Sequence, residues 1–175
     1  MKDQIKNQKF SYKNQVCLGL GSNIDPERNI LKAVELLQNI FHLAGISSAW
    51  ESFPVGSNGP KFINAALNFN TDLNLDKLKR EFLIPVEAQL GRVRTSDKYA
   101  PRTIDLDVLI WNEEIVDPEL VKLPHLAVPV AELSPGFRPF RGTETIEEIA
   151  GVLNSNKALV FCPEISQKLR ELFRS

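Results

Sequence analysis

The sequence has no surplus of either charge, no long apolar run and almost no cysteine. It contains 21 Lys and Arg against 22 Asp and Glu, so broad binding to nucleic acid is not expected. Its apolar runs fall far short of the roughly 20 residues that cross a bilayer, and its first residues have no signal-peptide pattern. We therefore expect a cytoplasmic protein without membrane contact. Cys17 and Cys162 lie far apart beside apolar residues, which favours two free thiols over a disulfide.

Length and composition indicate one globular domain. The chain has 175 residues, of which 43% are hydrophobic and 25% charged, enough to close a single core. Residues 1–15 contain four lysines and no apolar period, so we expect a flexible N-terminal arm there. Residues 16–175 are expected to form one domain that acts as a monomer.

Short apolar or alternating segments predict strands. They cover residues 16–20, 46–53, 64–71 and 104–111. The second and third are joined by a Pro, Gly and Ser loop, which indicates an antiparallel pair.

Apolar residues at helical spacing predict two helices between these strands. The first should begin with Asp25 as its N-cap and Pro26 in its first turn, and should end near Gly45. The second should cover residues 75–90 and bend at Pro85, which removes a backbone donor. Two more helices are expected near the C-terminus, over residues 146–153 and 165–173.

The order strand, helix, strand, strand, helix, strand predicts an α+β fold of the ferredoxin-like type (βαββαβ). Its helices would cover one face of an antiparallel sheet, followed by C-terminal helical embellishment. Fold alone does not determine function.

Two carboxylates carry the main chemical signal. Asp105 and Asp107 are two apart on a predicted strand, so both side chains project from one face. Such a pair repels unless a cation lies between the carboxylates, and hard oxygen ligands suit Mg²⁺ completed by phosphate oxygens. Four cations precede the strand, namely Arg92, Arg94, Lys98 and Arg102. Together these residues predict a site for a metal ion and a polyphosphate, although each feature alone is more often a solvated surface.

Other nucleotide-binding and nucleophile motifs are lacking. The sequence has no GxxxxGK[ST] loop, and residues 19–23 (GLGSN) resemble a phosphate-cradling turn only weakly. Those residues fit a strand-to-helix turn equally well. The only histidines are His42 and His125, and neither is an evident base for Ser22, which argues against a serine nucleophile.

Residues 98–109 (KYAPRTIDLDVL) resemble the signature of the 6-hydroxymethyl-7,8-dihydropterin pyrophosphokinases of folate biosynthesis. Further matching segments follow the family's order and are residues 20–23 (LGSN), 51–56 (ESFPVG), 62–66 (FINAA), 87–94 (EAQLGRVR) and 123–125 (LPH). The resemblance extends from about residue 16 to residue 151. It implies transfer of pyrophosphate from ATP to the hydroxymethyl oxygen of the pterin, giving AMP, with two Mg²⁺ ions.

The resemblance also implies roles for individual residues. Asp105 and Asp107 would bind the metal ions and, with Arg92 and Arg102, form the catalytic set. The implied ATP contacts are Glu87, Arg92, Arg94, Lys98, Arg102, Val108 and His125. The implied pterin contacts are Ser52, Phe53, Val55, Phe62 and Asn64. Taken by itself, Phe62 would be interpreted as a core residue and Asn64 as a turn residue.

One departure from the family concerns the segment after His125. Family members usually continue with a loop whose arginine and aromatic residue close over the substrates, whereas residues 126–133 follow His125 directly here. We hypothesise that Arg138 or Arg141 partly replaces the lost arginine, although a surface loop without function is the simpler interpretation. Two alternatives therefore stay open, a related Mg-ATP pyrophosphokinase acting on another alcohol and a non-catalytic nucleotide-binding protein.

Overall fold

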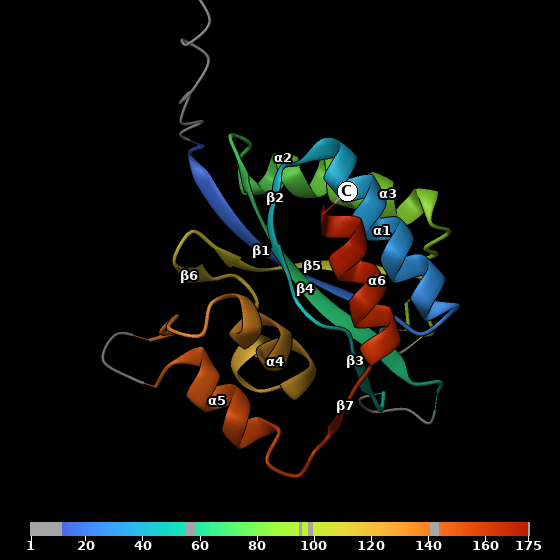
Figure 1. Cartoon of the computed structure of the whole chain (residues 1–175). Coiled ribbons are helices and arrows are strands. Elements are labelled where there is room, and N and C mark those ends of the chain that lie inside the picture. Colours follow the sequence, from blue (N-terminus) through green and yellow to red (C-terminus); the bar gives the residue numbers. More distant parts are fainter. Residues whose placement is uncertain (1–11, 55–58, 95, 98–99, 141–143, 175) are drawn as a thin grey trace, which may run out of the picture.

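The computed structural model describes residues 12–54, 59–94, 96–97, 100–140 and 144–174, and its centre is a twisted antiparallel sheet (Figure 1). The strands are β1 (Asn14–Ser22), β2 (Leu43–Ile46), β3 (Trp50–Ser52), β4 (Phe62–Thr71), β5 (Asp105–Trp111), β6 (Glu114–Ile115) and β7 (Leu159–Phe161). Their order is β6-β5-β1-β4-β3-β7, and β2 also pairs with β4. The predicted antiparallel pairing is confirmed by β3 and β4, where Trp50 lies opposite Asn64. The single strand predicted over residues 46–53 was wrong, because this range is divided between β2 and β3.

One face of the sheet is covered by α1 (Pro26–Ile40), α3 (Ile84–Gln89) and α6 (Pro163–Arg174) (Figure 1). The predicted apolar stripe of α1 is buried in this layer and comprises Ile30, Val34, Leu37 and Phe41. The helix ends at Ile40 and not near Gly45, because β2 already begins at Leu43. Asp25 occupies the N-cap position, but its side chain makes no capping hydrogen bond and its φ is 44°. Asp25 is therefore at the predicted N-cap position, but the prediction that its side chain caps the helix was wrong.

The second predicted helix is interrupted at the expected place. It consists of α2 (Leu75–Leu78), a π-helical turn η1 (Lys79–Leu83) and α3. The Ile84 N–H donates to the Lys79 carbonyl, five residues back. This wider turn immediately precedes Pro85, which has no N–H and would crowd the carbonyl of a regular preceding turn.

The opposite face of the sheet is covered by α4 (Pro124–Leu133) and α5 (Ile146–Leu153) (Figure 1). Ala127 and Val130 of α4 and Ile146 of α5 join Cys17, Leu109 and neighbouring residues in a second apolar cluster. The short 3₁₀ turn η2 (Pro118–Val121) leads into α4. The α+β, ferredoxin-like fold is thus confirmed, and the added helices lie on both faces: α4 and α5 on this one, and α6 beside α1.

The first strand begins slightly earlier than predicted, and both cysteines are free thiols. β1 begins at Asn14, inside the expected arm, and residues 1–11 lie outside the described residues. Cys17 is buried and Cys162 half-buried, and both are free thiols, as predicted. Burial raises the pKa of the Cys17 thiol to about 12, so it is protonated at neutral pH. No described helix has the length and hydrophobicity needed to cross a lipid bilayer.

Candidate active site

Asp105 and Asp107 project from the face of β5 that α4 covers. Their neighbours across β1 are Gly21 and Gly19, which have no side chains. The alternating residues Leu106 and Val108 are buried in the core on the other face, as the period-two pattern predicts. Both carboxylates therefore line a pocket of about 310 Å³ at one end of the sheet.

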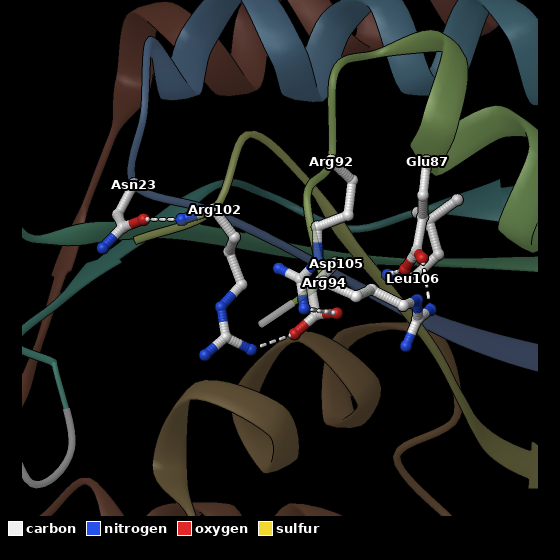
Figure 2. A network of polar contacts seen from close by, with 7 residues as sticks. All are labelled: Asn23, Glu87, Arg92, Arg94, Arg102, Asp105 and Leu106. Carbon is white, nitrogen blue, oxygen red and sulfur yellow. Dashed lines mark hydrogen bonds and ion pairs between the residues drawn. The ribbon is translucent and has the colours of Figure 1, made fainter. Parts of the chain in front are cut away.

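Asp105 is held between two arginines (Figure 2). Its Oδ1 lies 3.1 Å from Arg92 Nη2, and its Oδ2 accepts a hydrogen bond from Arg102 Nη1. All three side chains are less than one-fifth exposed. The Nε and Nη1 groups of Arg92 are buried and have no hydrogen-bond partner among the described residues. Unpaired buried donors are costly, so these two groups are available to a further hydrogen-bond acceptor.

Asp107 has a different electrostatic environment. Its pKa is raised to about 7, chiefly because the surrounding protein limits its solvation and secondarily because Asp105, Asp117 and Glu87 are negative. Arg102 opposes this shift. Asp107 is nevertheless exposed, and solvent reaches it through the pocket. Two neighbouring carboxylates suit Mg²⁺, which commonly uses one or two carboxylates and takes its remaining ligands from phosphate and water.

Glu87 and Arg94 do not line the pocket. The Glu87 carboxylate is buried, and its Oε1 accepts a hydrogen bond from the Leu106 N–H at 2.9 Å. Its Oε2 accepts from Arg94, whose side chain is 61% exposed (Figure 2). Glu87 thereby holds the free edge of β5 between the two aspartates. Arg94 instead borders a neighbouring cavity of about 230 Å³ together with Arg92 and Arg102.

The expected pterin contacts form the opposite wall of the pocket. Ser52, Phe53, Phe62 and Asn64 line it, whereas Val55 lies outside the described residues. Asn64 is buried, and its Nδ2 donates to Ser52 Oγ at 2.9 Å and to the Trp50 carbonyl at 3.1 Å. A Cβ on Gly21 would lie 3.6 Å from Asn64 Oδ1 and 3.9 Å from the Phe62 ring. The missing side chain at Gly21 therefore leaves room at the pocket floor.

The roof of the pocket comes from the segment around the start of α4. His125 and Leu126 of α4 line it together with Leu123 and Glu119. Burial lowers the pKa of His125, partly opposed by Asp117, so the imidazole is neutral at pH 7. Sequence reasoning identified His125 and included Leu123 only as part of the matching segment 123–125, without a role, and it missed Glu119 and Leu126, for which no motif gave a signal. Gly19 and Gly21 did give one, since two glycines at alternate positions of a strand leave one face bare.

The remaining predicted residues are spread more widely. The Val108 side chain is in the core, so only its backbone could reach a nucleotide. Lys98 and Arg141 lie outside the described residues. The positive charge of Arg138 helps to lower the pKa of Glu148 at the start of α5. Arg138 is not among the residues that line the pocket. The structure therefore gives no support to Arg138 as a replacement clamp.

The sequence model of the 7,8-dihydro-6-hydroxymethylpterin-pyrophosphokinase family (HPPK) matches residues 17–135. The chain belongs to the HPPK family. The matched residues include both aspartates, the arginines and the pterin-side wall, whereas α5, β7 and α6 lie beyond them.

Curated relatives and solved structures agree with this membership. A 2-amino-4-hydroxy-6-hydroxymethyldihydropteridine pyrophosphokinase of Aquifex aeolicus is 38% identical over 115 residues, covering 63% of this chain and 69% of the relative. The enzyme of the same name from Methylorubrum extorquens is 36% identical over 154 residues, covering 78% of this chain and 92% of the relative. The crystal structure of Plasmodium falciparum HPPK-DHPS A437G with SDX-DHP matches with a TM-score of 0.61 at 12% identity. The match covers 85% of this chain and 47% of the Plasmodium chain, so this chain spans about half the length of that protein. Because the identity is only 12%, the likeness concerns the fold alone.

Proposed function

We propose that this HPPK family member transfers pyrophosphate from ATP to the hydroxymethyl group of 6-hydroxymethyl-7,8-dihydropterin in folate biosynthesis. The pterin oxygen would attack the β-phosphorus while the bond from that phosphorus to the oxygen bridging it to the α-phosphorus breaks. The hydroxyl proton would be released to solvent, and AMP would leave with the bridging oxygen. The observation that carries this proposal is one pocket in which Asp105, Asp107 and Arg102 face the wall formed by Phe62 and Asn64.

Asp105 and Asp107 would hold Mg²⁺, and we propose two ions. The metal would neutralise phosphate charge and hold the triphosphate in place. The chain's own share is the fixed orientation of the carboxylates. β1 and β5 hold both on one face in register, and Glu87 satisfies the strand-edge N–H between them.

The arginines would bind the phosphates. Arg102 lines the pocket itself, and Arg92 has buried donors that the described protein leaves unused. Guanidinium groups pair bidentately with phosphate oxygens and stabilise the charge that grows as the bridging bond breaks. Arg94 and Lys98 would add positive charge at the rim. Neutral His125 and the backbone of Val108 would contact the nucleotide.

The wall of Phe62 and Asn64 would take the pterin. Asn64 is fixed by its bonds to Ser52 and Trp50, so its amide presents a rigid hydrogen-bonding group to a heterocycle edge. The Phe62 ring offers a stacking surface next to the bare Gly21. Ser52, Phe53 and Val55 would complete this side. Such positioning matters most in phosphoryl transfer, because in-line alignment replaces much of the covalent chemistry.

We propose a monomer in the cytoplasm as the working form. α4 begins at Pro124, so we propose that the reaction runs under α4 and without the closing loop of other family members.

A pterin-dependent assay tests the function. The purified protein with MgATP and the reduced hydroxymethylpterin should produce AMP and pterin pyrophosphate in equal amounts, and chelation of Mg²⁺ should stop it. AMP formation with other primary alcohols but not with the pterin would favour a different substrate. Tight ATP binding without any turnover would favour a non-catalytic protein.

A further inference from the structure

Asn23, the residue that follows β1, holds the backbone of Arg102 (Figure 2). Asn23 Oδ1 accepts a hydrogen bond from the Arg102 N–H at 2.7 Å. The N–H groups of Asn23 and Ile24 both donate to the Arg102 carbonyl, at 3.1 and 3.2 Å. Asn23 and Ile24 thus satisfy both backbone polar groups of Arg102. Asn23 and Arg102 are 79 positions apart in the sequence.

The neighbouring residue strengthens the same attachment. Ser22 is fully buried, and its Oγ donates to the Thr103 carbonyl at 2.5 Å. The turn at residues 22–24 therefore binds two successive residues of the loop that enters β5. The N–H groups of Asn23 and Ile24 both donate to the Arg102 carbonyl, so they are not available to phosphate oxygens. The turn therefore fixes the loop that enters β5 and does not bind phosphate.

Asn23 also reaches the pterin side of the pocket. Its Nδ2 donates to the Pro60 carbonyl at 3.4 Å, in the segment that leads into β4. β4 begins at Phe62, and the Arg102 guanidinium carbon lies 5.7 Å from the centre of the Phe62 ring. Asn23 is buried, with 6% of the residue exposed. Its side chain thereby joins the loop of Arg102 to the segment that leads into the strand of Phe62.

We propose that Asn23 is a positioning residue for Arg102, which it fixes between the phosphate-binding and pterin-binding sides of the pocket. This inference rests on the proposed function. Asn23 does not line the pocket among the described residues, so it acts through the Arg102 backbone. With that backbone fixed, the guanidinium is held beside Asp105 and Phe62 before substrates arrive, and such preorganisation lowers the barrier of the transfer step.

Substitution of Asn23 tests the proposal against a matched control. In Asn23→Ala the Arg102 N–H loses its acceptor, and we expect kcat to fall about tenfold or more, with a smaller change in the KM for ATP. Asn29 is the control, because its Nδ2 donates to the Ile24 carbonyl at 2.6 Å in the same turn without contacting Arg102. Asn29→Ala should keep the kcat of the parent protein. Equal kcat in Asn23→Ala and the parent would overturn the proposal.

A double-mutant comparison separates positioning from general damage. If Asn23 acts through Arg102, Asn23→Ala should cause no further loss of kcat in an Arg102→Ala background. Independent losses that multiply would show that Asn23 acts elsewhere and would overturn the proposal. Asn23→Asp keeps an acceptor for the Arg102 N–H and loses the donor to Pro60, so it should retain more kcat than Asn23→Ala. An equal loss in both variants would contradict the assigned contact.

Amide hydrogen exchange gives a readout that needs no turnover. The Arg102 amide should exchange faster in Asn23→Ala than in the parent, and should stay protected in Asn23→Asp and Asn29→Ala. Unchanged protection in Asn23→Ala would overturn the proposal. If the parent protein shows no pterin-dependent AMP formation, the proposed function fails, while exchange still decides whether Asn23 holds Arg102.

Discussion

Arg102 and Asp105, three residues apart, form an ion pair through Nη1 and Oδ2 at the start of β5. The residue proposed to bind phosphate and the residue proposed to bind metal therefore neutralise each other. Each would exchange this partner for a stronger one when MgATP enters, since the metal offers positive charge to Asp105 and the phosphates offer negative charge to Arg102. The pair thus orients both groups in advance.

Arg102→Ala should lower kcat by roughly 10²-fold or more, because it removes charge stabilisation beside the breaking bond. Arg94→Ala is the matched comparison and should act mainly on the KM for ATP, since Arg94 lies outside the pocket and is 61% exposed. Steady-state kinetics of AMP formation distinguish the two effects. An unchanged kcat in Arg102→Ala would remove Arg102 from the catalytic set.

Asp107→Asn should abolish turnover without lowering the free energy of unfolding in metal-free buffer. The substitution removes a negative charge that lies close to Asp105, Asp117 and Glu87, so repulsion is relieved. Asp105→Asn should destabilise the fold instead, because it weakens ion pairs with two arginines that are less than one-fifth exposed. Urea unfolding, together with the AMP assay, measures both. Clear destabilisation by Asp107→Asn would contradict this electrostatic account.

Local patterns made much of the fold and site predictable, and contacts between distant residues explain most of what was missed. The α1 stripe and the Asp105 and Asp107 pair follow from helix and strand periods, which depend only on neighbouring residues. α4 was missed because Pro129 interrupts a strongly apolar segment, which conceals the helical period. The bond between Asn23 and Arg102 joins residues 79 positions apart, and no local pattern specifies such a partner.

Phe62→Ala should weaken pterin binding by about 1–3 kcal/mol, the size of aromatic stacking on a base. Phe62 lines the pocket and is only half-buried, so the fold should lose less than the ligand does. Calorimetry with the hydroxymethylpterin in the presence of a non-hydrolysable ATP analogue measures this. Phe140→Ala is a control, since Phe140 is 56% exposed and is not among the lining residues. Equal pterin affinity in Phe62→Ala would assign Phe62 to packing.

Glu148→Gln should reduce stability at neutral pH but not in acid. Glu148 and Thr145 form a capping box at the start of α5, and the Thr145 N–H donates to Glu148 Oε2 at 2.7 Å. This bond lowers the pKa of Glu148 below its usual 4.5, so the carboxylate stabilises the fold above that pH and loses its effect as pH falls through the lower, folded-state pKa. Thermal melts of both proteins across this range should converge in acid. A constant difference at every pH would contradict the prediction.

Glu87→Ala should destabilise the fold more than it weakens ATP binding. The variant leaves the buried Leu106 N–H without the acceptor that lies 2.9 Å away, a loss of about 1–3 kcal/mol for an unsatisfied buried donor. Glu87→Gln keeps an acceptor and removes only the charge, so it should recover part of that stability. Urea unfolding gives the stability, and calorimetry gives the ATP affinity per folded molecule. Normal stability with lost ATP affinity in Glu87→Ala would restore Glu87 as a direct nucleotide contact, because a residue that only holds β5 cannot affect ATP without first affecting the strand.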